Sequence, residues 1–307
     1  MKLVTRFAPA PTGDLHLGHV VNAIYVWGVA RACRRGPASA GPVESRVLLR
    51  IEDHDRQRSR PAFEAGILED LAWLGFEADA QDDDPFVRQS DRHRVYESAL
   101  DGLRKRGLVY ACSCSRSEIV SATDAVGDGL QPVPTEIRYP ATCAHRGLAE
   151  SPGLGIRVRL EPAVERFDDW CHGPQEQRPS EQCGDLLARD RDGNWTYQFA
   201  VTVDDWLQGV TLVVRGDDLL ESTGRQIQLG RLLGRIEPPA FLHHPLVMKN
   251  PAQKLSKSDG DSGIRELRAK GWSAADVIGQ AAALAGLLKA PRPVSAGDVA
   301  DLVRRIR

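Results

Sequence analysis

Two histidines stand where a short apolar stretch gives way to a helical pattern. In "RFAPAPTGDLHLGHVV", residues 6–21, His16 and His19 flank Leu17 and Gly18 at the start of that pattern. The N-terminus of a helix has unpaired N–H groups and a partial positive charge, so it attracts anions before any side chain is added. Imidazoles at that place can donate hydrogen bonds to phosphate, and Gly18 leaves room for a nucleotide to approach closely. Taken alone, the motif is also compatible with a pair of surface histidines.

A second polar motif lies near the other end of the chain. "KLSKS", residues 254–258, follows the apolar "PLVMKN" and brings two lysines and two serines into one loop. Lysine ammonium groups bind phosphates as point charges, so a loop of this kind has the chemistry to close over a triphosphate. By itself, such a composition usually indicates only a solvent-exposed loop.

Three cysteines and a tyrosine fall within one segment. Cys112 and Cys114 form a C-x-C pair, and Tyr139 precedes Cys143 in "YPATC". Zn²⁺ takes four tetrahedral ligands, usually Cys or His, so a tyrosine is an unusual fourth. The residues leave two alternatives open: three buried reduced cysteines without a metal, or His145 as the fourth ligand.

The first 107 residues contain the elements that must position the histidines. Residues 2–9 predict a short strand ended by prolines, residues 18–36 a helix, and residues 46–53 a nearly continuous apolar strand. A β-α-β unit of this kind requires a parallel sheet whose faces are covered by helices. Two further helices are predicted over residues 60–75 and 90–107. Residues 1–107 therefore predict the first half of a doubly wound, Rossmann-type α/β fold.

The pattern changes after that point. Residues 108–190 look like an inserted α+β segment that includes the cysteines, and residues 191–260 predict the second half of the sheet. Residues 261–307 are rich in Ala, Leu and Arg and predict a short helical C-terminal region. Within the second half, a helix is expected at 197–210, a strand at 211–218, a helix at 219–234 and a strand at 241–250.

Composition sets wider bounds on the kind of protein. The chain has 307 residues, of which 27% are charged and 42% hydrophobic, and its formal net charge is −2. No apolar run is long enough to span a bilayer, and the apolar stretch at the N-terminus is too short for a signal peptide. We therefore expect a cytoplasmic protein without membrane contact. Six scattered cysteines do not predict a disulfide framework.

Together the two polar motifs resemble the signatures of the class I aminoacyl-tRNA synthetases, because "HLGH" is similar to HIGH and "KLSKS" to KMSKS. The resemblance implies an enzyme in which an amino-acid carboxylate attacks the α-phosphate of ATP in line and pyrophosphate leaves. It implies ATP-binding roles for two groups of residues. These are His16, Gly18 and His19 in the first motif, and Lys254, Ser256 and Lys257 in the second. Four of these residues are also expected to be catalytic, namely His16, His19, Lys254 and Lys257. Mg²⁺ would accompany ATP.

Further segments resemble the glutamyl branch of that family. "RFAPAPTG" is close to its RFAPSPTG opening, and "RIEDHDRQR", "YQFAVTVDD" and "VVRGDDLLEST" are similar to segments that complete its glutamate pocket. The resemblance places Arg6, Glu52, Tyr197 and Arg215 around L-glutamate, with Arg215 on the side-chain carboxylate and Glu52 on the ammonium. Ala10 departs from the pattern, because the family has a serine whose hydroxyl would contact the substrate's amino group; we expect weaker affinity.

C-x-C followed by Y-x3-C is similar to the metal set of one subfamily, the glutamyl-queuosine tRNA(Asp) synthetases. This implies one structural Zn²⁺ held by Cys112, Cys114, Tyr139 and Cys143. Only 49 residues follow Ser258, so we expect no anticodon-binding domain of the kind that full glutamyl-tRNA synthetases have. The subfamily transfers glutamate to queuosine at the wobble position of tRNA(Asp), which makes the anticodon loop of that tRNA the expected partner of a monomeric enzyme.

Two other functions remain open at this stage. One is a truncated glutamyl-tRNA synthetase that charges a tRNA 3′ end. The other is a catalytically silent relative that binds tRNA or glutamate.

Overall fold

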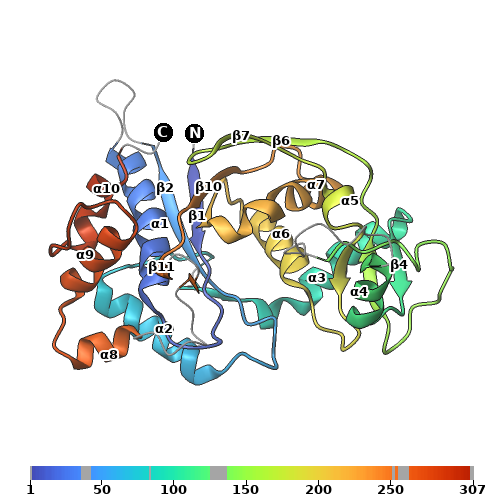
Figure 1. Ribbon diagram of the computed structural model, residues 1–307, viewed down its shortest axis with the longest axis horizontal. Helices are drawn as coiled ribbons and strands as arrows, with labels where there is room; N and C mark the ends of the chain where they lie inside the picture. The colour runs from blue at the N-terminus through green and yellow to red at the C-terminus, as the bar shows by residue number, and fades with distance from the viewer. Residues whose placement is uncertain are drawn as a thin grey trace.

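The computed structural model describes residues 2–35, 43–82, 84–124, 137–250, 253–254 and 263–304. Its N-terminal part is the β-α-β unit that the sequence predicts, and Figure 1 shows helix α1 lying along strands β1 and β2. The first strands are parallel, with Leu3 opposite Ser45, and the short β3 extends the ladder on the far side of β2. The elements of this part are β1 (Leu3–Phe7), α1 (Leu17–Arg35), β2 (Ser45–Ile51), α2 (Pro61–Leu74), β3 (Val87–Arg88), η1 (Gln89–Arg92) and α3 (His93–Lys105).

A second parallel ladder completes the sheet. Strands β6, β10 and β9 are parallel neighbours, and β7 adds an antiparallel edge. The backbone N–H of Thr211 donates to the carbonyl of Val4 at 2.8 Å, which places β9 beside β1 and joins the two ladders. The elements are β6 (Glu165–Asp169), β7 (Gly173–Gln177), α6 (Tyr197–Leu207), β9 (Leu212–Gly216), η2 (Asp217–Ser222), α7 (Thr223–Leu233), β10 (Ala240–His244), β11 (Met248–Asn250) and β12 (Gln253–Lys254).

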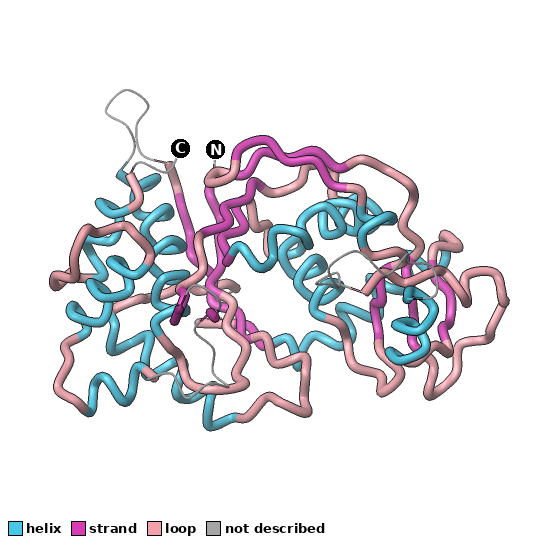
Figure 2. The backbone as a smooth tube through the Cα atoms, in the orientation of Figure 1, coloured by secondary structure: helices cyan, strands magenta, loops and turns pink. Residues whose placement is uncertain are grey.

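Helices cover both faces of this sheet, as Figure 2 shows. Alternate residues of β9 point to opposite faces: Leu212 and Val214 join the core formed with α1, whereas Val213 packs with Ile227 of α7. This alternation is what a strand with two buried faces requires. The doubly wound parallel sheet predicted from the sequence is therefore confirmed.

Residues 165–177 are a feature that the sequence does not predict. "ERFDD" and "GPQEQ" form β6 and β7, and β6 pairs with β10 in the second ladder. Both strands are rich in polar residues, so neither shows a clear alternation of apolar and polar positions. The predicted strand at 241–250 is also corrected, because β10 ends at His244 before Pro245 and a separate strand, β11, follows.

The remaining middle residues form a small module at one end of the molecule. Strands β4, β5 and β8 make an antiparallel sheet, and α4 lies beside it in Figure 1. Its elements are β4 (Val109–Cys112), α4 (Arg116–Asp124), β5 (Gly155–Val158), α5 (Pro179–Gln182) and β8 (Leu186–Arg189).

The C-terminal helices pack on the opposite end, against α1. Gly28 permits this close approach, because a Cβ there would lie 2.8 Å from Val303 Cγ2 and 3.0 Å from the Val299 carbonyl oxygen. The elements are α8 (Ile264–Ala269), α9 (Ala274–Leu284), η4 (Ala296–Asp298) and α10 (Val299–Leu302). None of the helices in the described part of the chain is long and apolar enough to cross a membrane.

One buried carboxylate lies near the seam between α2 and α8. Asp70 is fully buried, and neither of its oxygens has a hydrogen-bond partner among the described residues. Burial raises its pKa to about 6, against a partial opposing effect of Arg265 on α8. Arg265 and Arg268 are bonded instead to the neighbouring Glu69, each at 3.0 Å.

Candidate functional site

A cavity of about 510 Å³ opens at the carboxyl ends of β1 and β9, beside the start of α1. In an open α/β sheet this edge is where ligands bind. The cavity brings together eight residues that the sequence singles out, from positions more than 200 residues apart. They are Arg6, Ala10, His16, Gly18, His19, Glu52, Tyr197 and Arg215.

The remaining residues that are predicted to bind ATP belong to the "KLSKS" motif. Lys254 is the last residue of β12, while Ser256 and Lys257 lie outside the described residues. The chain after them returns to the cavity, because Gly263 forms a bridge with His16 and the N–H of Ile264 donates to the Leu15 carbonyl at 2.9 Å. Gly263 and Ile264 are therefore joined to the start of α1.

His16 and His19 cap the N-terminus of α1 reciprocally. The Nδ1 atom of His16 accepts from the N–H of Gly18 at 3.1 Å, and Nδ1 of His19 accepts from the N–H of His16, also at 3.1 Å. A nitrogen that accepts has no proton, so each neutral ring carries its proton on Nε2. The pair therefore presents Nε2–H donors at a helix N-terminus, which is the arrangement that suits a phosphate.

The structure gives a second reason for a glycine at position 18, besides access for a ligand. A Cβ at this position would lie 2.9 Å from Cε1 and 3.1 Å from Nδ1 of His16. The ring of His16 thus occupies the space that a side chain would need. The sequence predicts room for a nucleotide here, whereas the structure shows that the glycine also makes room for the capping histidine.

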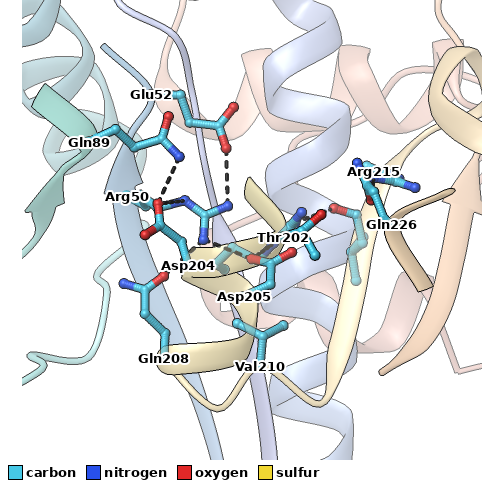
Figure 3. Close-up of polar contacts among 12 residues, drawn as sticks. Arg50, Glu52, Gln89, Thr202, Asp204, Asp205, Gln208, Val210, Arg215 and Gln226 are labelled. Atoms are coloured by element: carbon cyan, nitrogen blue, oxygen red, sulfur yellow. Dashed lines mark hydrogen bonds and ion pairs between the residues drawn. The ribbon is translucent and has the colours of Figure 1, made fainter. Parts of the chain in front are cut away.

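A buried network of charged side chains holds Arg6 and Glu52 in place. Figure 3 shows the part of this network around Arg50. Asp205 accepts from Arg6 Nε at 3.0 Å and from Arg50 at 2.7 Å, and Arg50 also donates to Glu52 at 3.1 Å and Gln208 at 2.8 Å. Burial disfavours the charge on Asp205, but the two arginines outweigh it and lower the pKa of this carboxyl. The network fixes the positions of Arg6 on β1 and of Glu52 after β2.

The network continues into α6 and α3. Asp204 accepts from Gln89 at 2.8 Å, Arg92 at 2.6 Å and Tyr96 at 2.8 Å, and it lies 3.8 Å from Nε of Arg50. Buried charges need partners and filled hydrogen bonds, and this set satisfies nearly all of them. The one orphan among these polar atoms is Nε of Arg50.

Arg215 differs from the other buried arginines of the site. Its Nε donates to His243 at 2.9 Å, Nη1 to Gln226 at 2.6 Å and Nη2 to Thr223 at 2.9 Å. All three acceptors are uncharged, and within the described chain Arg215 makes no ion pair with a carboxylate. Burial lowers the pKa of Arg215, the expected sign for a desolvated cation, although an arginine stays charged at neutral pH.

Tyr197 and Ala10 complete the wall of the cavity. Tyr197 begins α6, and burial together with the nearby Glu52 raises the pKa of its phenol, so the hydroxyl keeps its proton and can donate. Ala10 lies in the turn after β1, where its carbonyl accepts from the N–H of Thr12 at 2.9 Å. As the sequence shows, its methyl side chain offers no hydrogen bond.

The predicted cysteines meet at one place in the small module. The sulfurs of Cys112, Cys114 and Cys143 all lie within 4.8 Å of one another, and those of Cys114 and Cys143 are 3.6 Å apart. Tyr139 is buried beside them, with its hydroxyl 3.3 Å from Cys112 Sγ and accepting from the N–H of Cys143 at 2.9 Å. His145 is exposed and is not part of this cluster.

Protonation differs among these thiols. Burial raises the pKa of Cys114 to about 11. Burial also opposes ionisation of Cys143, but hydrogen bonds from Ser113 outweigh it and lower the pKa of that thiol to about 6. Three convergent sulfurs, one of which ionises readily, form a donor set that fits Zn²⁺, for which S–Zn bonds of about 2.3 Å place tetrahedral sulfurs about 3.8 Å apart.

A second cavity of about 580 Å³ lies between the cysteine cluster and α6. Cys112, Cys114 and Tyr139 line one side of it, and Tyr197 and Gln198 line another. Tyr197 therefore borders both cavities. The sequence gives no signal for this second space.

Several residues that position the site were also missed by the sequence prediction. Asp205, Gln226 and His243 contact the predicted arginines directly, yet they lie 199, 11 and 28 residues from their partners. Two further residues, Asn22 and His244, are joined at 3.0 Å and line the first cavity. A polar residue in an otherwise apolar strand, such as His243 in "FLHHP", is the signal that was available.

Comparison with known proteins identifies the family. A model of the catalytic domain of class I tRNA synthetases (E and Q) matches residues 2–282. The glutamyl-Q tRNA(Asp) synthetase of Rhodobacter capsulatus is 40% identical over 287 residues, which cover 90% of this chain and 98% of that protein. The corresponding protein of Nitratidesulfovibrio vulgaris is 40% identical over 296 residues, 92% of this chain and 86% of that protein.

A solved structure agrees with this assignment. The glutamate tRNA ligase of Elizabethkingia meningosepticum, in complex with its amino acid, superposes with a TM-score of 0.75 at 26% identity. The match covers 98% of this chain but 64% of that one, so the chain spans less than two thirds of the ligase. The chain belongs to the class I tRNA synthetases, in the family of the glutamyl-Q tRNA(Asp) synthetases, and is a glutamate- and tRNA-related ligase.

Proposed function

We propose that this ligase activates L-glutamate with ATP and transfers it to queuosine at the wobble position of tRNA(Asp). The observation that supports glutamate most directly is Arg215, a buried cation without a carboxylate partner among the described residues, in the same cavity as His16 and His19. Three of its five N–H groups are used by neutral acceptors. In this proposal the terminal nitrogens of Arg215, which lines the cavity, bind the side-chain carboxylate of glutamate.

The other two charges of the substrate have matching groups. Glu52 bears the negative charge that suits the ammonium, and Arg6 contributes a second cation for the α-carboxylate. Asp205 and Arg50 hold these side chains in place, so little ordering is needed when glutamate binds. Tyr197 borders the bound amino acid, while Ala10 contributes only its backbone.

The ATP roles follow from the start of α1. His16 and His19 would donate from Nε2 to phosphate oxygens, and Gly18 keeps the backbone accessible. Lys254, Ser256 and Lys257 would stabilise the charge that builds up on pyrophosphate as the glutamate carboxylate attacks the α-phosphate. Mg²⁺ bound with ATP would neutralise further phosphate charge. These residues bind and orient the reactants, and no covalent enzyme intermediate is required.

The second cavity is where we place the acceptor. Because it shares Tyr197 with the glutamate cavity, a nucleoside there would stand next to the activated carboxyl group. The exposed side chains of Arg116 and Arg191 line it and suit a phosphate backbone. A base turned out of an anticodon loop is a typical target of specific RNA recognition. The names of the relatives, glutamyl-Q tRNA(Asp) synthetases, support queuosine in tRNA(Asp) as that nucleoside.

We also propose that Cys112, Cys114 and Cys143, with Tyr139 as the fourth ligand, hold one structural Zn²⁺. The convergence of the three sulfurs supports the thiols, and the buried hydroxyl near Cys112 supports the tyrosine. Bound zinc would cross-link β4 to the loop around Cys143. In this proposal residues 108–190, apart from β6 and β7, form the metal-containing insertion. Residues 1–107 and 191–260 form the catalytic halves, to whose sheet β6 and β7 belong, and residues 261–307 form a helical region.

Glutamate-dependent exchange of label between pyrophosphate and ATP tests the activation step. We expect exchange with L-glutamate and at least about 100-fold less with L-glutamine or L-aspartate, because neither places a carboxylate on Arg215. Arg215→Met should abolish the preference for glutamate over glutamine and aspartate, whereas the surface variant Arg166→Met should retain this preference. Exchange that is absent with glutamate, with and without tRNA, would favour a binding protein and refute the proposal.

A further inference from the structure

Arg215 belongs to a hydrogen-bonded chain of three residues from three neighbouring strands. His243 on β10 accepts from Nε of Arg215 on β9 at 2.9 Å, and Nδ1 of His243 lies 2.7 Å from Oδ2 of Asp169 on β6. All three residues are buried. The chain therefore runs from the cavity wall into the sheet, and its far members do not line the cavity.

The hydrogen bonds fix which nitrogen of His243 carries the proton. Because Nδ1 faces a carboxylate, it must be the donor, and because Nε2 faces an N–H of Arg215, it must be the acceptor. The ring is then neutral with its proton on Nδ1. An imidazolium, or the other tautomer, would place an N–H against the N–H of Arg215.

Asp169 has enough other partners to stay ionised at this depth. Its Oδ1 accepts from the N–H groups of Cys171 and His172 at 2.9 and 3.1 Å, and its Oδ2 accepts from the N–H of His243 at 3.1 Å. Burial disfavours its charge, but the hydrogen bond from the His243 ring, with those from the N–H groups of Cys171 and His172, lowers the pKa of Asp169. The carboxylate therefore does not need Arg215 as its counter-ion.

We propose that Asp169 and His243 are positioning residues that set the specificity of the site for a substrate carboxylate. The imidazole separates Asp169 from Arg215, so the guanidinium is held firmly while its charge remains available to the substrate. A carboxylate in direct contact with Arg215 would compete with the side chain of glutamate. This inference rests on the proposed binding of glutamate by Arg215.

Burial, assisted by the charge of Arg215, keeps the ring of His243 neutral. Asp169 on β6 and Asp217 on η2 favour an imidazolium, whereas burial and Arg215 on β9 disfavour it. Burial dominates, and the pKa of His243 is lowered. The ring is consequently neutral at pH 7, as the hydrogen bond from Arg215 requires.

Asp169→Asn tests the assignment. An asparagine can turn its N–H₂ group toward Nδ1, which would move the ring proton to Nε2 and oppose the N–H of Arg215, as the corresponding change does in serine proteases. We expect KM for glutamate to rise about 10- to 100-fold and the preference over glutamine to fall by a similar factor. KM for ATP should stay within about 2-fold, because no phosphate contact is touched.

Two further variants separate positioning from packing. His243→Gln retains an acceptor for Arg215 and a donor for Asp169, so its KM for glutamate should stay closer to that of the wild type than the KM of His243→Leu. Asp79→Asn is the matched control, because Asp79 also accepts a backbone N–H, from Val47 at 2.7 Å, and binds an arginine, but outside the cavity. It should behave as wild type.

The ¹⁵N chemical shifts of His243 in the wild-type protein give a readout that needs no substrate. A proton on Nδ1 is expected, and a proton on Nε2 would overturn the inference whatever the enzyme activates. If wild-type exchange depends on glutamate but Asp169→Asn leaves its KM and its preference unchanged, the inference is wrong and the proposed function stands. Wild-type exchange that does not depend on glutamate would overturn both.

Discussion

Asp70→Asn isolates the cost of one buried charge. Asparagine has nearly the same shape and places two polar atoms at the same positions, one of them an amide nitrogen, but it cannot ionise. The pKa of Asp70 is raised from 3.8 to about 6 because burial disfavours its charge. A carboxyl group whose pKa is higher in the folded than in the unfolded protein does not lower the free energy of unfolding at pH values below its unfolded pKa. At pH values above its folded pKa it lowers the free energy of unfolding by the full amount.

The expected magnitude follows from these two values. The shift from 3.8 to about 6 corresponds to about 3 kcal/mol at pH 7.5, where Asp70 is charged in both states. At pH 5 the folded protein is mostly protonated at this position, and the cost falls to about 1.6 kcal/mol. Asp70→Asn should therefore raise the free energy of unfolding at both pH values, and by about twice as much at pH 7.5.

Urea denaturation at pH 5 and pH 7.5 measures this difference. Glu69→Gln is the matched control, since it removes a neighbouring exposed carboxylate whose ion pairs with Arg265 and Arg268 contribute little. A variant Asp70→Asn that is no more stable than wild type at pH 7.5, or whose gain is the same at both pH values, would refute the reasoning.

Three other predictions concern the site and the module. Gly18→Ala should lower the rate of glutamate-dependent pyrophosphate exchange about 10- to 100-fold, because its Cβ would displace His16; an unchanged rate would show that the capping geometry is not needed. Arg50→Lys should lose about 2–4 kcal/mol of stability in urea denaturation and raise KM for glutamate, because an ammonium cannot replace the fork that bonds Asp205 and Glu52. Equal stability and KM in the variant would argue against the network as the support of the pocket. Cys143→Ser should lower the zinc content measured by metal analysis to well below one per chain, whereas zinc absent from both proteins would refute the metal site.

How far the sequence could predict this site depends on the range of each contact. His16, Gly18 and His19 lie within four consecutive residues, so their spacing alone indicates that they lie together, whereas their role follows from the family resemblance. Arg6 and Arg215 are joined to the same site only because β1 lies beside β9, an arrangement that the β-α-β pattern and the family resemblance supply. These residues were predicted and do meet in one cavity.

The supporting residues could not be predicted in the same way. Asp169 lies on β6, a polar strand without a clear period, so neither the strand nor its pairing with β10 was expected. The contacts of Asp205 with Arg6 and Arg50 join positions 199 and 155 residues apart, and nothing local distinguishes this aspartate from a surface carboxylate. The cysteines differ, because the family resemblance predicts Cys143 together with Cys112 and Cys114. The folded module brings these three sulfurs together and leaves His145 outside the cluster.

Transfer of labelled glutamate to tRNA tests the central claim most directly. The enzyme, ATP and labelled glutamate are incubated with tRNA(Asp) that contains or lacks queuosine, and with tRNA(Glu), after which the tRNA is digested and its nucleosides are separated. We predict label only with queuosine-containing tRNA(Asp), and in the fraction that contains queuosine. Label on the 3′-terminal adenosine, or on tRNA(Glu), would contradict the account and indicate an enzyme that charges tRNA ends.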